Sequence, residues 1–257
     1  MESSILTALV LPLALGIIMF GLGLTLTVAD FKRVVVFPKA AMIGLGCQML
    51  VLPLVGFGLA KIFSLQPELA VGLMLLAASP GGATANLFSH LANGDVALNI
   101  TLTAVNSVLS LFTLPLIVNF ALIAFMGEGK VIPLQFAKVI QVFLIVLVPV
   151  SLGMILRSKN GSLAASMEKP MRILSALVLL LVIIGAVAKE RSNVVTFFQQ
   201  VGLVALTFNL LSMAIGYFVP LAARLPRKQA VAIGMEIGVH NGALAIAIAS
   251  SPLMLNN

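Results

Sequence analysis

Long runs of apolar residues fill most of this chain, and each run is close to the length that crosses a lipid bilayer as a helix. Hydrophobic residues make up 61% of the 257 positions, and only 9% are Asp, Glu, Lys or Arg. Soluble domains carry about 25% charged residues. A chain this apolar has too few polar side chains to cover a surface in water. The composition therefore predicts an all-α polytopic membrane protein.

Eight hydrophobic segments are predicted to span the membrane, because each approaches or exceeds the roughly 20 residues that a hydrocarbon core requires. The segments are Ile5–Val28, Pro38–Phe63, Glu68–Ala92, Asp95–Met126, Val131–Leu156, Met171–Ala188, Val194–Ala222 and Arg227–Leu253. No connection between them is long enough to fold by itself. We therefore expect one transmembrane domain over residues 1–257.

The net charge of +7 comes mainly from cations placed in the short connections between segments. Ten of the 15 Lys and Arg residues fall on one predicted side: Lys32, Arg33, Lys39, Arg157, Lys159, Lys169, Arg172, Arg224, Arg227 and Lys228. Cytoplasmic loops carry such an excess, so this side is predicted to be cytoplasmic. We expect the lipid bilayer as a partner, and neither nucleic acid nor an obligate protein partner.

The third segment is interrupted by the sequence SPGG at residues 79–82. Proline lacks a backbone donor and clashes with the preceding turn, and glycine lowers helical preference further. Apolar sequence continues on both sides, so we expect a discontinuous membrane helix whose freed backbone groups are buried in protein or line a cavity. A simple kink is the alternative. Thr84 and Asn86 favour a break, because they place polar side chains where the second half would begin.

A related interruption falls in the eighth segment, where Gly238 and Gly242 flank residues 239–241. The third and eighth segments are five apart, so they cross the membrane in opposite directions. Paired interruptions in oppositely oriented halves indicate an inverted-topology repeat. Segments one to three would then correspond to segments six to eight, although the two halves share no convincing residue identity.

Glu236 is the one acid predicted to lie within a hydrophobic span. An acid at the bilayer centre costs about 2.5–3.5 kcal/mol on insertion scales, so it normally faces a cavity or a partner. Broken helices expose N–H groups that suit an anion and carbonyl groups that suit a small hard cation. Glu236 is the candidate for the negative charge of such a cation site.

Several amides and hydroxyls are candidate oxygen ligands for the same cation. They are Gln48, Asn86, Asn99, Thr103, Asn106 and Ser107. Asn99 and Thr103 are four residues apart and share a helical face. Each amide alone is equally compatible with a hydrogen bond between membrane helices. Their number near the two interruptions favours a site.

His240 follows Glu236 by four residues, and four interpretations of it remain open. It is a neutral histidine satisfied by its neighbours, a cation ligand, or a proton-carrying group, since histidine titrates near physiological pH. With His90 it could instead complete a metal site with Glu236, which would make the protein an intramembrane metalloenzyme. The chain has no HExxH run, and we expect no enzymatic activity.

Four motifs occur in an order typical of one transporter family. They are GIIMFGLGL at 16–24, followed by Asp30-Phe31; SPGGATAN at 79–86; NGDVALNITLT at 93–103; and MEIGVHNGALA at 235–245. With these motifs the chain resembles the bile acid:sodium symporter family, and in particular its bacterial homologues, over nearly its whole length. The resemblance implies a bacterial inner (plasma) membrane location.

The resemblance also implies the fold, with two crossing discontinuous helices and an inverted repeat of five helices per half. It places core helices at about 38–126 and 194–253, and panel helices at about 5–28, 131–156 and 171–188. The first segment is similar to the family's second helix and the eighth to its ninth. The family's first and last helices would thus have no counterpart among the eight segments.

The same resemblance implies ligands, residue by residue. The first sodium site would comprise Asn86, Asn99, Thr103 and Glu236, with Asn99 where a serine is usual. The second would comprise Gln48, Glu236, the carbonyl groups of Ile237 and Val239, and His240, which replaces a glutamine. Ala83, Thr84 and Asn241 match positions that face substrate. Imidazole suits sodium poorly, so the second site is the doubtful one.

The function implied is sodium-coupled symport of an organic anion by alternating access. The substrate would be bile-acid-like, pantoate-like or another small carboxylate, and sodium would be a co-substrate, with no further cofactor. A proton-coupled or uncoupled anion transporter is the first alternative, and the intramembrane metalloenzyme is a distant one.

Overall fold

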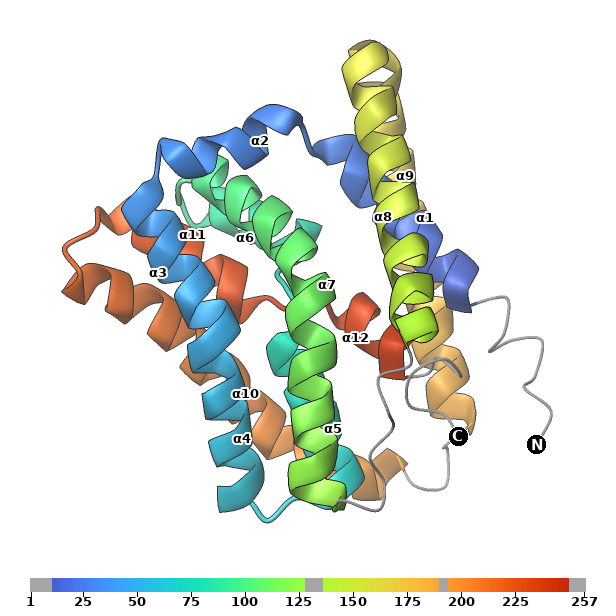
Figure 1. Cartoon of the computed structure of the whole chain (residues 1–257), viewed down its shortest axis with the longest axis vertical. Coiled ribbons are helices and arrows are strands. Elements are labelled where there is room, and N and C mark those ends of the chain that lie inside the picture. The colour runs from blue at the N-terminus through green and yellow to red at the C-terminus, as the bar shows by residue number, and fades with distance from the viewer. Residues whose placement is uncertain (1–10, 128–135, 190–193, 250–257) are drawn as a thin grey trace. The chain divides into compact units, whose positions relative to one another are not determined.

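The structure, a computed structural model, describes residues 11–127, 136–189 and 194–249 (Figure 1). The α-helices are α1 (Leu11–Thr25), α2 (Val28–Lys32), α3 (Pro38–Gly46), α4 (Leu52–Ile62), α5 (Pro67–Ala78), α6 (Ala83–Leu91), α7 (Val96–Met126), α8 (Phe136–Lys159), α9 (Gly161–Lys189), α10 (Val194–Ala222), α11 (Arg227–Gly238) and α12 (Gly242–Ala249). In these three ranges the only β-type pairing is one isolated bridge. The predicted all-α fold is confirmed.

Three described helices are long and apolar enough to cross a membrane by length and composition. They are Pro38–Ile62, which joins α3 and α4 through a π-helical turn, Val96–Met126 and Val194–Ala222. A fourth span results if Leu13–Thr25 and Val28–Val35, which meet at 73°, count together. The interrupted third and eighth segments consist of shorter helices, as a break requires. The prediction of eight spans remains a prediction.

The connection predicted between the fifth and sixth segments is wrong in one respect. Residues 157–170 were expected to form a loop, but α8 continues to Lys159 and α9 begins at Gly161. The Asn160 side chain accepts a hydrogen bond from Leu163 N at 3.1 Å, which caps the first turn of α9. Cations assigned to a loop therefore lie on helices.

The described part of the chain divides into two compact units. The first takes in the described residues of Met1–Val28, Leu134–Phe198 and Gly242–Asn257. In it α1 packs against both α8 and α9, and α12 also contacts α1. Two glycines bring α1 and α8 together: a Cβ at Gly153 would lie 2.6 Å from the carbonyl oxygen of Phe20, and one at Gly23 2.9 Å from Val150 Cα. Close backbone approach through small residues is a common way for membrane helices to associate.

Gly23→Ala is expected to weaken the packing of α1 against α8. The added methyl group would clash with backbone atoms of Val150, which cannot rotate away as a flexible side chain can. Overpacking of this kind costs about 1–3 kcal/mol. Gly185→Ala is the matched control in the same unit, because a Cβ there meets nothing within 4 Å. Thermal unfolding in detergent should show a lower midpoint for Gly23→Ala alone. Equal midpoints for both variants would disprove the close contact.

The second unit comprises Ala29–Pro133 and Gln199–Asn241. In it α5 packs against α4 and α7, while α11 packs against α6 and α7 (Figure 1). One core cluster lies around Phe208, Leu52 and Ile237, each 0% exposed. Another joins α3, α7 and α11 through Ala41, Leu98 and Ile233. Helices α5 and α11, which precede the two breaks, are therefore held in this unit by apolar packing.

A structural repeat relates α4–α5 to the end of α10 and α11. Ser64 and Arg224 both have positive φ, at 50° and 60°, and end the preceding helix in the same way. Leu65 N donates to Ala60 O at 3.0 Å, and Leu225 N donates to Pro220 O at 2.9 Å. In the turn at Arg224, each of these residues has a number 160 higher than the equivalent residue in the turn at Ser64. A helix of 12 residues follows each turn and ends at a break. The predicted pairing of segments two and three with seven and eight requires such equal spacing, and the inverted repeat itself stays a prediction.

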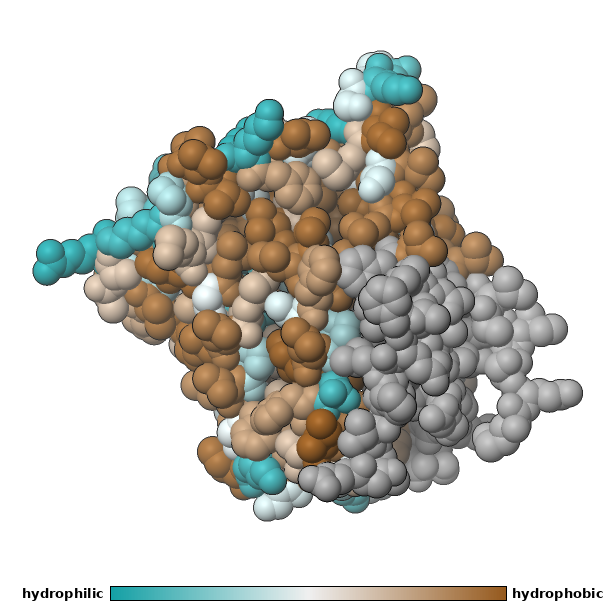
Figure 2. Space-filling view, in the orientation of Figure 1, coloured by the Kyte–Doolittle hydropathy of each residue, from teal (hydrophilic) through white to brown (hydrophobic). Residues whose placement is uncertain are grey.

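The outer surface of this unit is apolar. In Figure 2 hydrophobic residues cover most of its visible face, and hydrophilic residues gather near helix ends. Exposed apolar side chains recur one helical turn apart, as at Phe112, Leu116 and Phe120 on α7, which are 58%, 63% and 53% exposed. Such a surface is suited to contact with lipid, and polar functions must lie inside.

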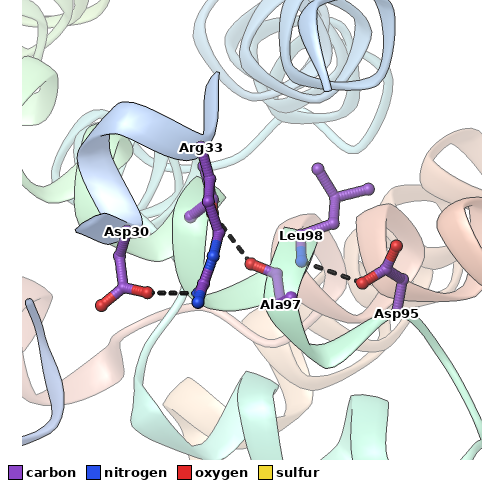
Figure 3. A network of polar contacts seen from close by, with 6 residues as sticks. Asp30, Arg33, Asp95, Ala97 and Leu98 are labelled. Carbon is purple, nitrogen blue, oxygen red and sulfur yellow. Dashed lines mark hydrogen bonds and ion pairs between the residues drawn. The ribbon is translucent and has the colours of Figure 1, made fainter. Parts of the chain in front are cut away.

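Polar contacts at one end of this unit fix the start of α7 (Figure 3). Asp95 accepts a hydrogen bond from Leu98 N at 3.1 Å and caps the helix, while its own N–H donates to Lys228 O at 2.9 Å. Nearby, Arg33 pairs with the buried Asp30 at 2.5 Å. The contact with Lys228 connects the start of α7 to the first turn of α11, and so helps to align the two helices that carry the candidate site.

Candidate functional site

The break in the third segment is confirmed. Helix α5 ends at Ala78, Ser79 is extended with φ −73° and ψ 135°, and α6 begins at Ala83. The second break follows α11, which ends at Gly238, and α12 begins at Gly242. Gly81 and His240 form an antiparallel bridge, in which Asn241 N donates to Pro80 O at 2.8 Å. The two breaks therefore meet and satisfy part of each other's backbone.

Glu236 lies in the last turn of α11 and is 0% exposed. Its Oε2 accepts a hydrogen bond from Thr103 Oγ1 at 2.6 Å, and its Oε1 accepts one from Asn106 Nδ2 at 3.3 Å. The backbone N–H of Gly81 also donates to the carboxylate. These partners are all neutral. The buried carboxylate thus has donors but no cation among them, which is a costly arrangement unless a positive ligand offsets the charge.

Two amides beside the carboxylate have oxygen atoms without a donor. Asn99 donates through Nδ2 to Ala232 O at 2.7 Å, and its Oδ1 is buried and unpartnered. Asn106 Oδ1 is likewise buried and unpartnered. Asn86 Oδ1 lies 3.4 Å from Thr103 Oγ1. We call Asn86, Asn99, Thr103, Asn106 and Glu236 the Glu236 cluster. It offers a small cation both negative charge and unused oxygen atoms.

Gly81 is packed against the carboxylate. A Cβ at this position would lie 2.5 Å from both Cδ and Oε1 of Glu236. No other residue type fits here without a shift of the site, so the glycine of the break serves close approach to the carboxylate. A Cβ at the neighbouring Gly82 would meet nothing closer than 3.6 Å.

A second polar group gathers at the end of α5. Gln48 lies in the π-helical turn Cys47–Val51 and donates through Nε2 to Ala77 O at 3.2 Å and Ser79 O at 2.9 Å. Nδ1 of His240 lies 3.5 Å from the same Ser79 oxygen. The imidazole stacks on Phe208, with ring centroids 5.2 Å apart. Gln48 Oε1 and His240 Nε2 are buried without a partner. We call Gln48, Ser79 and His240 the Gln48 cluster.

The remaining predicted site residues lie around the breaks. Ile237 is fully buried, and the N–H of Val239 donates to Met235 O at 3.0 Å. Thr84 is exposed in the first turn of α6, while Asn241 is partly buried and bonded to Pro80. The side chain of Ala83 lies outside the described residues. The structure thus brings together the residues predicted for the first site; that they bind sodium or substrate stays a prediction.

Asn209 on α10 is a residue that the sequence reasoning missed. Its Nδ2 donates to Gly238 O at 2.8 Å, at the carbonyl end of α11. Gln48 has the equivalent role at the carbonyl end of α5, where its Nε2 donates to Ser79 O. The residue number of Gln48 is 161 lower than that of Asn209. The π-helical turn at Gln48 holds one extra residue, which accounts for the difference from the spacing of 160. An amide at equivalent positions of two repeated helices was the signal available in the sequence.

These features define an all-α, multi-pass integral membrane protein with a buried, oxygen-rich carboxylate site. The sequence matches the model of the Sodium Bile acid symporter family over residues 5–197. The chain belongs to this family, and its class is transporter rather than enzyme. Within the described ranges no group of three or more His, Cys, Asp or Glu residues could hold a metal ion.

Several proteins with transporter names are similar to the chain. An uncharacterized sodium-dependent transporter, YocS, of Bacillus subtilis (strain 168) is 32% identical over 244 residues, which cover 92% of this chain and 72% of that protein. The probable chloroplastic sodium/metabolite cotransporter BASS1 of Oryza sativa subsp. japonica is 27% identical, covering 90% and 56%. The ileal sodium/bile acid cotransporter of Oryctolagus cuniculus is 24% identical, covering 95% and 70%.

Proposed function

We propose that this protein is a secondary active transporter that couples sodium entry to the uptake of an organic anion across a bacterial plasma membrane. The observation that carries the proposal is the Glu236 carboxylate, which is 0% exposed and held by neutral donors. An ionisable group in a membrane protein interior is a functional site by default, because its burial is costly. The family and the names of the similar proteins support sodium as the cation.

The Glu236 cluster is the proposed sodium site. Asn86, Asn99, Thr103 and Glu236 would supply oxygen atoms, and Asn106 joins them on the evidence of its unpartnered Oδ1. These residues come from α6, α7 and α11. A sodium ion among them would tie the two interrupted helices to α7. Binding would thereby order both breaks at once, which is how a cation can prepare a site for a second ligand.

The substrate proposal rests on the start of α6. Gly82 precedes this helix and provides no side-chain cap, so the first N–H groups of α6 are not satisfied by one. Thr84 in the first turn of α6 is exposed, and the backbone N–H of Asn241 donates to Pro80 O in the break before α6. A helix start of this kind favours an anion. We propose that Ala83, Thr84 and Asn241 contact a bile-acid-like, pantoate-like or other small carboxylate.

Transport would follow by alternating access, with the core helices moving against the panel helices. Uptake of labelled carboxylates into proteoliposomes tests this function. An inward sodium gradient should accelerate uptake of at least one of them, and an equal potassium gradient should not. Uptake that is indifferent to sodium for every anion carried would contradict the proposal.

Thr103→Val is expected to weaken sodium binding about tenfold or more. The change removes the hydroxyl that would supply an oxygen ligand to the ion and that positions the Glu236 carboxylate at 2.6 Å, and an interaction with a charged group contributes about 1.5–3 kcal/mol. Thr101→Val is the matched control, because that buried hydroxyl donates only to Ala97 O of its own helix among its described contacts. Sodium titration of the purified variants measures the sodium affinity of each. Equal sodium affinities for the two variants would exclude Thr103 from the site.

A further inference from the structure

We infer that each chain binds one sodium ion, at the Glu236 cluster, and that His240 keeps a second sodium ion from binding at the Gln48 cluster. This inference rests on the proposed function and adds the cation count and the residue that sets it. It follows from comparing which acceptor atoms are already used in the two clusters.

The carbonyl groups around the Gln48 cluster already receive donors. Gln48 Nε2 donates to Ala77 O and Ser79 O at 3.2 and 2.9 Å, and His240 Nδ1 faces Ser79 O at 3.5 Å. Pro80 O accepts from Asn241 N at 2.8 Å. A carbonyl oxygen has two lone pairs. Two side-chain nitrogen atoms, Gln48 Nε2 and His240 Nδ1, face the carbonyl oxygen of Ser79. A sodium ion could coordinate the Ser79 oxygen only by displacing Gln48 or His240.

The second break shows the same use of carbonyl groups. Asn209 Nδ2 donates to Gly238 O at 2.8 Å, and Val239 N donates to Met235 O at 3.0 Å. Amide side chains thus satisfy the carbonyl ends of both α5 and α11. In the Glu236 cluster two buried amide oxygen atoms, those of Asn99 and Asn106, have no donor, whereas the Gln48 cluster has one, Gln48 Oε1, and no carboxylate. Unused oxygen acceptors remain where the carboxylate lies.

Charge separates the two clusters further. The buried acids of the described residues are Glu236 and Asp30, and Asp30 pairs with Arg33 at 2.5 Å. One carboxylate offsets one sodium ion. The Gln48 cluster contributes only neutral groups, and a second desolvated cation there would lack a counter-charge.

His240 gives the Gln48 cluster a different ligand preference. Its ring is fixed by stacking on Phe208. With Nδ1–H directed at Ser79 O, the buried Nε2 is a nitrogen acceptor, and Gln48 Oε1 is a second unused acceptor. Neutral acceptors of this kind suit a neutral hydrogen-bond donor, such as water or a hydroxyl group, better than a hard cation.

Equilibrium binding of radioactive sodium to the purified full chain, with potassium as the replacement ion, tests the count. Wild type should saturate at one ion per chain. Glu236→Gln should bind none. His240→Gln exchanges the imidazole nitrogen for an amide oxygen and should raise the count above one, with a Hill coefficient above one.

Two ions per wild-type chain would overturn this inference and leave the proposed function intact. A sodium ion bound by Glu236→Gln with wild-type affinity would also overturn it, because the counted ion would then not depend on the carboxylate; this arm does not require that His240→Gln folds. A folded His240→Gln variant that still binds one ion would remove His240 as the determinant. No sodium binding by wild type would instead contradict the proposed function, and this inference with it.

Discussion

Glu236→Gln is expected to abolish sodium-driven uptake, because glutamine keeps the size of the side chain and removes its charge. Loss of one partner of a buried charge pair costs about 3–5 kcal/mol, which corresponds to roughly 10²–10⁴-fold in sodium affinity. Thr103 and Asn106 bond directly to this carboxylate, and Gly81 packs on it. Uptake into proteoliposomes under a sodium gradient measures the effect.

The same variant should be at least as stable as wild type when sodium is absent. The carboxylate is 0% exposed and its described partners are neutral, so its charge is a burden to the sodium-free fold. Glu68→Gln is the control, because this acid is exposed in the first turn of α5. The Glu68→Gln variant should retain sodium-driven uptake. Sodium-driven uptake by Glu236→Gln at the wild-type rate would remove the carboxylate from the mechanism.

Gly81→Ala is expected to have the second large effect. The added methyl group would lie 2.5 Å from Cδ and Oε1 of Glu236 and 2.6 Å from its carbonyl oxygen. Part of this contact is with backbone, which cannot rotate away, so the bridge to His240 or the carboxylate must shift. Overpacking costs about 1–3 kcal/mol, and we expect sodium affinity to fall at least tenfold, measured by sodium titration of the purified variant.

Gly82→Ala is the matched control one residue further along the same break. Its backbone is extended, with φ −110° and ψ 177°, which any residue adopts. A methyl group there would meet its nearest neighbour, Thr84 Oγ1, at 3.6 Å. Sodium affinity should stay close to that of wild type. If the two alanine variants behaved alike, the close approach of Gly81 to Glu236 would not matter for binding.

The breaks could be predicted from the sequence because their causes are local. One proline followed by two glycines at residues 80–82 disfavours a continuous helix through local backbone preferences alone. Glu236 was also identifiable, since a lone acid in an apolar span requires a polar environment. Helix α9 was placed too late, because polar residues and a proline interrupt the apolar pattern over residues 161–170, and a search for apolar runs passes over them.

Other features depend on contacts between distant segments. Whether Gln48 offers its oxygen or its nitrogen to the break is decided by the π-helical turn and by the position of Ser79. Asn209 lies on an exposed apolar helix, and only the approach of Gly238 gives it a role. The stacking of His240 on Phe208 likewise joins residues from different helices. Hydropathy contains no information on such pairings, and the equivalent positions of Gln48 and Asn209 were the one signal that spacing offered.

The central claim, that the buried carboxylate binds sodium, is tested most directly by thermal unfolding of purified wild type and Glu236→Gln in sodium or potassium chloride at equal ionic strength. A ligand that binds the native state raises the unfolding midpoint as its concentration rises. We predict a saturable rise with sodium for wild type, and none for Glu236→Gln or with potassium. Equal sodium-dependent stabilisation of both proteins, or none in wild type, would contradict the account.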